Sequence, residues 1–150
     1  MQAIHHVFTI AAPPERVYES LSTTPGLAHW WTTEVGGSSL RLGDVIEFTF
    51  GAGFDPLMRI TVLEPPERVS WEFVGGHDNW EGSSFEFHLE RAPQGTLVRF
   101  WQYYGRALSD DDFGIYNYNW GYYLESLRLF CETGAGKPFR PENRVSSAAP

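Results

Sequence analysis

Residues 115–133 read IYNYNWGYYLESLRLFCET, and this stretch decides the fold. Its large apolar residues recur at alternating intervals of four and three: Tyr116, Trp120, Tyr123, Leu127 and Phe130. This is the spacing of a helix that buries one broad face, and charged residues fall between the apolar positions where they can face water. Gly134 is well placed as the C-terminal stop. The sequence therefore predicts a long helix over residues 115–133.

The chain before this helix is typical of strands. Short apolar or alternating segments follow one another, separated by turn residues such as those at 51–56 and 65–67. We expect strands at 4–10, 40–42, 44–50, 57–64, 68–74, 96–104 and in a segment through Phe85, Phe87 and Leu89. No helix-length segment separates the strands after residue 40. The sheet should be an antiparallel meander, because a parallel crossover needs a dozen or more residues.

Residues 11–31 are the exception within this strand-rich part. Pro13 and Pro14 followed by Glu15 indicate the start of a short helix. The sequence Thr24-Pro25-Gly26 should break it, and a second short helix should carry Trp30 and Trp31 back onto the fold. Residues 105–114, with three consecutive aspartates, are expected to form an acidic loop at the edge of a lid.

One long helix must then cover a whole sheet. A helix about 10–12 Å wide cannot fill the concave face of a curved sheet. Large aromatic residues can close some of the gap, since the chain has 6 Trp, 7 Tyr and 11 Phe, and the remainder is a candidate cavity. We expect a single domain over residues 1–139 and a flexible tail over 140–150, which is polar and contains two prolines.

Composition excludes several classes of function. A net charge of −8 argues against nucleic-acid binding, which needs a cationic surface. The single cysteine, Cys131, excludes an internal disulfide and lies on the apolar stripe of the helix, where a small core residue is expected. No basic and apolar leader opens the sequence, and no apolar run approaches the length of a membrane span. We therefore expect a cytoplasmic protein, and the oligomeric state stays open.

Three motifs resemble a known family. The first is APPERVYESL at residues 12–21, the second is TPGLAHWW at 24–31, and the third is WGYYLESL at 120–127 followed by ETG at 132–134. Together they resemble the Aha-type branch, named after the activator of the heat-shock chaperone ATPase. This branch belongs to the START/birch-pollen-allergen-like (SRPBCC) superfamily. The resemblance spans about residues 4–139, and the central strands match mainly in pattern.

The resemblance implies an α+β helix-grip fold. In this fold two short helices follow strand one, and a curved seven-stranded antiparallel sheet surrounds a long C-terminal helix, with an apolar cavity between them. The superfamily includes lipid carriers, hormone receptors, aromatase/cyclases and chaperone regulators. A small hydrophobic ligand is therefore the expected partner, a chaperone is a second possible partner, and no cofactor is implied.

The candidate binding residues are those expected to surround the space between helix and sheet. Large aromatic residues form most of the set, because apolar walls with a few polar groups are typical of ligand pockets. Their alternative role is simple core packing. The set is His6, Trp30, Trp31, Phe48, Phe50, Trp71, Phe73, Phe85, Phe87, Gln102, Tyr116, Trp120 and Tyr123. Gln102 would need a hydrogen-bond partner if its amide faced inward, and a ligand oxygen or trapped water could supply it.

Catalytic and metal-binding patterns are weak. Alternation along their strands places Glu47 and Glu72 outside, away from the apolar face. His77, Asp78 and Glu81 lie in a predicted loop without a metal-ligand spacing, so we expect no metal site. Three functions stay open: binding of a lipid-like or planar aromatic molecule, a cyclase- or isomerase-type enzyme using the same cavity, and a protein-interaction module such as a chaperone regulator.

Overall fold

The computed structural model describes residues 2–37 and 40–141. The predicted tail at 140–150 therefore lies mostly outside the described residues. The elements in chain order are β1 (Ala3–Ile10), α1 (Pro14–Ser22), α2 (Thr24–Trp30), β2 (Glu34–Gly36), β3 (Val45–Thr49), β4 (Leu57–Glu64), β5 (Arg68–Gly75), η1 (Asp78–Trp80), β6 (Ser84–Ala92), β7 (Gly95–Tyr103) and α3 (Asp110–Thr133).

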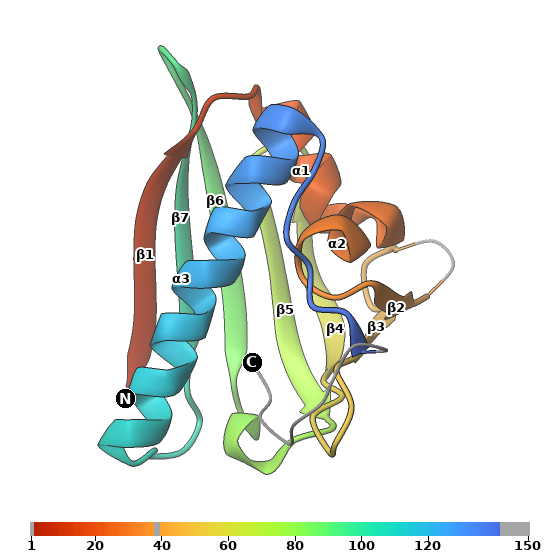
Figure 1. Ribbon diagram of the computed structural model, residues 1–150, viewed down its shortest axis with the longest axis vertical. Helices are drawn as coiled ribbons and strands as arrows, with labels where there is room; N and C mark the ends of the chain where they lie inside the picture. The colour runs from red at the N-terminus through yellow and green to blue at the C-terminus, as the bar shows by residue number, and fades with distance from the viewer. Residues whose placement is uncertain (1, 38–39, 142–150) are drawn as a thin grey trace.

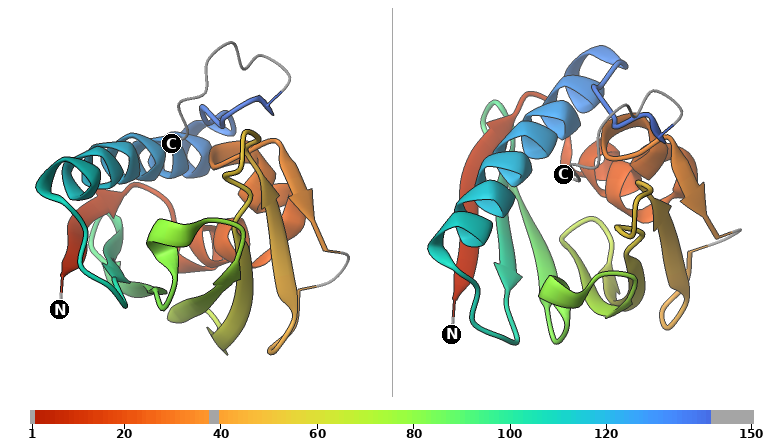
Figure 2. Two further views of the ribbon diagram at one scale, coloured as in Figure 1. Left: turned by 90° about the horizontal axis from the view of Figure 1, so that it is seen from below. Right: turned by 60° about the horizontal axis from the view of Figure 1, so that its bottom comes forward.

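The strands form one seven-stranded sheet in the order β1-β7-β6-β5-β4-β3-β2, and every pair is antiparallel. Figure 1 shows α3 lying in front of the sheet, with α1 and α2 beside its C-terminal end. Figure 2 shows the sheet curving around the side on which α3 lies. The predicted α+β helix-grip architecture is confirmed.

The long helix begins five residues earlier than predicted, because α3 starts at Asp110. The Ser109 side chain caps it by accepting a hydrogen bond from the Asp112 backbone N–H at 3.1 Å. Three aspartates in the first turn suit the positive end of the helix dipole. The acidic segment at 110–112 is thus a helix start, and the expectation of a loop through residue 114 was wrong. Gly134 ends α3 with φ 85°, as predicted.

The second correction concerns the sheet edge. Residues 40–42 were expected to form a strand, but Arg41 instead opens a turn in which its backbone N–H donates to the Asp44 carboxylate at 3.0 Å. Gly43, at φ 89°, completes that turn. The edge strand is β2, only three residues long, whose Val35 pairs with Phe48. So short a segment carries almost no alternation, which is why the sequence pattern missed it.

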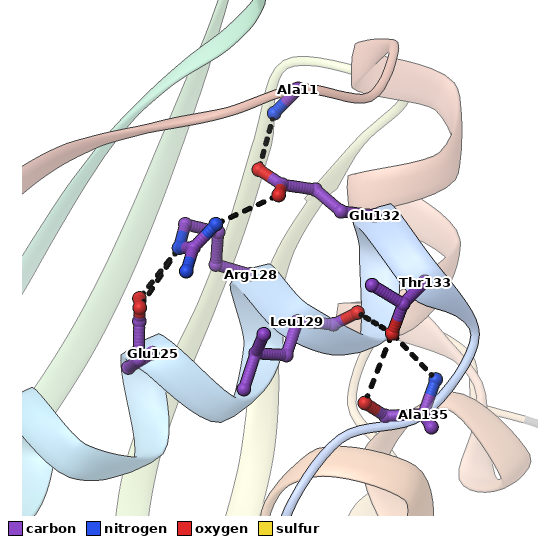
Figure 3. A network of polar contacts seen from close by, with 7 residues as sticks. All are labelled: Ala11, Glu125, Arg128, Leu129, Glu132, Thr133 and Ala135. Carbon is purple, nitrogen blue, oxygen red and sulfur yellow. Dashed lines mark hydrogen bonds and ion pairs between the residues drawn. The ribbon is translucent and has the colours of Figure 1, made fainter.

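Polar contacts fix the C-terminal half of α3 to the elements around it. Glu132 accepts a hydrogen bond from the Ala11 backbone N–H at 2.8 Å, and Arg128 bridges Glu132 and Glu125 along the helix (Figure 3). Arg16 of α1 donates to the Cys131 carbonyl at 2.7 Å. We call the Glu132–Ala11 and Arg16–Cys131 contacts, with those of Ser126, the C-terminal anchor.

Ser126 is the buried member of this anchor. Its hydroxyl donates to the Trp30 carbonyl at 2.8 Å and accepts from the Lys137 backbone N–H at 2.7 Å. One side chain therefore joins α3, the end of α2 and the segment that follows α3. Cys131 nearby is buried, as predicted from its place on the apolar stripe.

Candidate functional site

The space between α3 and the sheet is nearly full. The pocket between α3 and the sheet holds a void of about 10 Å³, about what one water molecule requires. The lining residues are Trp31, Phe54, Trp80, Tyr116, Asn119, Trp120 and Tyr123. This void is much smaller than the open apolar cavity expected from the sequence. We call these seven residues with their void the aromatic site.

The side chain of Trp31 is the reason why the space between α3 and the sheet is so small. It follows α2 directly, and its backbone N–H caps that helix by donating to Leu27 at 3.0 Å. Its side chain thereby enters the gap that one helix cannot fill. The Trp31 ring stacks on Trp120 at a centroid distance of 5.1 Å, while Phe48 meets it edge-on at 4.5 Å. Trp71 and Trp80 lie nearly parallel to it at 6.2 and 6.4 Å.

Two elements, α3 and η1, and two connecting segments build the aromatic site. Tyr116, Asn119, Trp120 and Tyr123 project from α3 at helical spacing. Phe54 comes from the turn between β3 and β4, and Trp80 ends η1. Trp31, Tyr116, Trp120 and Tyr123 were in the predicted set. Phe54 and Trp80 were missed because a turn and a three-residue helix have no periodicity that shows which way their residues point, and Asn119 was missed because a polar residue on α3 gives no apolar signal.

A polar cluster borders the site where η1 meets α3. The Tyr116 hydroxyl lies 2.6 Å from Nε2 of His77 and accepts a hydrogen bond from Asn79 Nδ2 at 3.3 Å. Burial lowers the pKa of His77, and the carboxylates of Asp78 and Asp112 offset part of that effect. Burial also raises the pKa of Tyr116. His77 and Tyr116 are therefore both neutral near pH 7, and we call the three residues the rim triad.

Gln102 is buried on β7, as its alternation predicted. Its Oε1 accepts a hydrogen bond from the Trp120 indole N–H at 2.7 Å, so it orients a ring of the aromatic site. Its Nε2 has no partner among the described residues. The amide oxygen of Gln102 therefore has a hydrogen bond within the protein. The amide nitrogen still lacks one, as the sequence analysis anticipated for an inward amide.

Further buried polar groups near the site have no partner of good geometry in the described part of the chain. They are the indole nitrogens of Trp71 and Trp80 and the hydroxyl of Tyr104. Trp80 lines the void, the Trp71 ring stacks on Trp31, and the Tyr104 ring lies 6.3 Å from Tyr116. Burial raises the pKa of Tyr104 above its usual range, so its hydroxyl keeps its proton. Together with Gln102, these groups place several hydrogen-bond donors around the aromatic site.

The remaining predicted residues form walls at a greater distance. Phe48, Phe50, Trp71, Phe85 and Phe87 are buried in the core, and Phe73 is half-buried against it. Trp30 is also buried, but its indole N–H donates to the Ser20 carbonyl at 2.9 Å, away from the void. His6 lies at the border of α3, where its Nε2 is 3.1 Å from the Asn117 amide oxygen, and burial lowers its pKa.

Two strand carboxylates, Glu47 and Glu72, lie on the outer face of the sheet. Glu47 is exposed, and Glu72 forms an ion pair with Arg59 at 3.1 Å, which confirms their predicted outward placement. Within residues 2–37 and 40–141, no group of three or more His, Cys, Asp or Glu side chains is arranged to hold a metal ion. No helix of the described chain is long and apolar enough to cross a membrane.

A comparison with protein families identifies the chain. The profile described as Activator of Hsp90 ATPase homolog 1-like protein matches residues 11–132, which is most of the sequence. The protein belongs to this family. The predicted Aha-type branch of the SRPBCC superfamily is thereby confirmed. No curated protein matches the chain.

Solved structures agree with this assignment. The Aha1 dimer from Colwellia psychrerythraea is 34% identical, with a TM-score of 0.81, over 91% of this chain and 100% of that one. Protein MLL2253 from Mesorhizobium loti is 19% identical with a TM-score of 0.74, over 85% of this chain and 95% of that one. An AHSA1-like protein from Aeromonas hydrophila is 18% identical with a TM-score of 0.66, over 86% and 91%. The latter two similarities establish the fold alone.

Proposed function

We propose that this protein binds a small planar aromatic molecule that carries hydrogen-bond acceptors, at the aromatic site. The observation that carries the proposal is a set of buried polar groups around aromatic walls that lack a hydrogen bond of good geometry: Trp71, Trp80, Gln102 and Tyr104. Trp80 and Tyr104 lie close enough to each other for the indole to lower the pKa of the hydroxyl slightly, but neither group is fully satisfied by that contact. Leaving such a group unpaired in the interior costs about 1–3 kcal/mol. A ligand with carbonyl or ether oxygens would satisfy these donors while its rings replace ring contacts within the site.

Binding requires the site to open, because the void is too small for any organic ligand. Phe54 and Trp80 come from loops, so they can move without breaking the sheet. Gly76, at φ 99°, and Gly82, at φ 79°, flank η1 and allow its backbone to turn. The rim triad holds η1 against α3 in the closed form. Ligand burial would contribute about 25 cal/mol per Å² of apolar surface to offset the cost of opening.

The experiment compares flavone, which is planar and carries a carbonyl, with palmitate as a flexible lipid. We expect flavone to raise the melting temperature and to quench tryptophan fluorescence. Trp80→Phe keeps a ring in the wall but removes the donor, so it should weaken flavone binding by about threefold to tenfold. Trp101→Phe is the matched control, since Trp101 stacks on His5 across the outer face of the sheet. Absence of any response to flavone would remove the proposal.

An enzyme of the cyclase or isomerase kind has less support. Such a reaction needs a proton-transfer group beside the substrate. Among the described residues, the carboxylates and histidines are exposed or half-buried, while the fully buried polar side chains are Ser, Thr and Gln. Within the rim triad, His77 and Tyr116 could exchange a proton with a molecule in the aromatic site. We therefore retain ligand binding as the proposal.

We further propose that the chain forms a homodimer. The Colwellia protein is a dimer in solution, and this chain covers its full length at 34% identity. A protein-interaction role for the fold also predicts an exposed apolar patch, and α3 carries one on its outer face. Sedimentation velocity over a range of protein concentrations tests this second proposal independently of ligand binding.

A further inference from the structure

A line of exposed apolar side chains runs along the outer face of α3. Ile115 is 53% exposed, Tyr118 is 78% exposed and Tyr122 is 49% exposed. Their spacing of three and four residues places them on one side of the helix, opposite the buried stripe. The other large exposed apolar residues, Val7, Leu42 and Val74, are scattered over two strands and a turn. We call residues 114–122 on this outer face the α3 patch; Figure 1 shows α3 on the open side of the sheet.

The patch is free of charge on a strongly acidic protein. Residues 113–124 contain no Asp, Glu, Lys or Arg, whereas the whole chain has a net charge of −8. In a two-fold symmetric contact the same surface of both copies meets, so a charged residue near the axis would face its own copy. An uncharged patch avoids this repulsion. The composition of the patch therefore suits a second copy of this chain. A basic partner would instead be attracted to the acidic surface elsewhere on the protein.

The patch has a shallow depression beside a projecting side chain. Asp110, Asp111, Gly114, Ile115, Tyr118 and Asn119 line a surface hollow. Gly114 creates part of this space, since a Cβ at its position would meet nothing within 4 Å. Tyr118 projects beside the hollow. If two α3 helices pack antiparallel, each Tyr118 can enter the hollow beside Gly114 of the other copy.

The same arrangement separates the acidic ends of the helices. An axis between Gly114 and Tyr118 lies about five residues from Asp111, so the two acidic turns stand roughly 15 Å apart along the helices. This is about twice the Debye length in physiological salt. The Tyr118 hydroxyl, entering a hollow bordered by Asp110 and Asp111, can donate a hydrogen bond to a carboxylate of the partner. The acidic residues at this position then support the contact.

We propose that the α3 patch is the interface of a two-fold symmetric homodimer, with Tyr118 as its central side chain; this proposal rests on the dimer proposed above. The patch presents three large exposed apolar side chains, whereas a standard interface uses about 20–30 residues a side. The dimer should therefore be reversible, with a dissociation constant on the order of micromolar.

The test is sedimentation velocity from about 5 to about 500 µM, the range that brackets a micromolar constant. Wild type should shift from monomer to dimer. Tyr118→Glu places a like charge at the axis and should weaken the dimer at least about tenfold. Gly114→Gln fills the hollow while favouring the helix, and should also weaken it by about tenfold. Leu42→Glu is the matched control: it adds the same charge at a side chain 66% exposed outside α3, and should leave the dimer unchanged.

The outcomes separate the two proposals. A wild type that dimerises while Tyr118→Glu dimerises equally well overturns the interface but leaves the dimer. If the wild type stays monomeric over the whole concentration range, both the dimer and its interface are overturned. The same holds if the protein stays monomeric and binds phosphatidylcholine vesicles through Tyr118. Circular dichroism of each variant checks that α3 is intact. None of these results affects the response to flavone, which tests the aromatic site.

Discussion

The two halves of α3 are held to the molecule by different kinds of contact. In the C-terminal half, polar bonds to other segments involve backbone groups: Glu132 accepts from the Ala11 N–H, Ser126 donates to the Trp30 carbonyl, and the Cys131 carbonyl accepts from the Arg16 side chain. In the N-terminal half, residues 113–124, the bonds join side chains only, as in Tyr116 with His77 and Trp120 with Gln102. Side chains can change rotamer and partner more easily than backbone can move. The difference indicates that a ligand would open the N-terminal half while the C-terminal anchor stays closed.

The largest expected effect comes from the core of the anchored half. Leu127 is fully buried, so Leu127→Ala should lower the free energy of unfolding by about 2–5 kcal/mol through lost burial and a cavity. Ile115→Ala on the same helix is the control, because Ile115 is 53% exposed in the monomer, and both variants are compared at a protein concentration well below that of dimer formation. It should change stability by less than about 0.5 kcal/mol. Urea denaturation measures both, and equal losses would contradict the assignment of the two faces.

Removal of one buried hydroxyl tests the anchor itself. Ser126→Ala leaves the Trp30 carbonyl and the Lys137 N–H without their partner, and should cost about 1–3 kcal/mol. The same urea denaturation series measures it. Thr133→Ala is the control, because its hydroxyl also bonds a backbone carbonyl but lies at the exposed end of α3. A larger loss in the control than in Ser126→Ala would mean that the anchor is not where the helix is held.

Release of the rim triad should cost less. Tyr116→Phe removes the hydroxyl that meets His77 and Asn79 but keeps the ring, so we expect a loss of about 0.5–1.5 kcal/mol. Since this contact must break before η1 moves, the variant should also bind flavone with a faster association rate. Stopped-flow tryptophan fluorescence measures that rate. A slower rate would indicate that Tyr116 helps to bind the ligand and does not restrain opening.

The smallest expected effect is a dependence on pH. Burial holds the pKa of His77 and His6 below the ordinary value near 6.5, so the unfolded chain binds protons that the folded chain does not. Their contribution to stability is present above that value and is lost as the pH falls below it. Urea midpoints should therefore decrease from about pH 7.5 to about pH 5.5. A variant with His6→Gln and His77→Gln should lose less over this range, and an equal loss would exclude these histidines.

The sequence predicted what periodicity encodes. The buried stripe of α3, the antiparallel order of the strands and the outward Glu47 and Glu72 all follow from spacing alone. The start of α3 was also readable, because Ser109 followed by three aspartates is a cap and an acidic first turn. Its acidity was instead taken as a sign of a loop. The three-residue β2 carries too little pattern to be found in this way.

The aromatic site was only partly predictable, for a physical reason. Spacing identifies which face a residue occupies, but it does not give the volume left between two faces. Trp31 fills the expected cavity because α2 ends beside it, which is a property of the assembled fold. Phe54 and Trp80 reach the site from turns, where no period indicates direction. Among the polar candidates that the sequence offered, Gln102 does contact a ring of the site.

Amide hydrogen exchange along α3 tests the central claim most directly, namely that one half of the helix opens while the other stays anchored. Buried amides differ in protection according to the local opening that exposes them. We predict that residues 125–133 exchange with the protection of the sheet, that residues 113–124 exchange earlier, and that flavone raises protection in 113–124 and 76–82 only. Uniform protection along α3, or greater protection in its N-terminal half, would contradict this account.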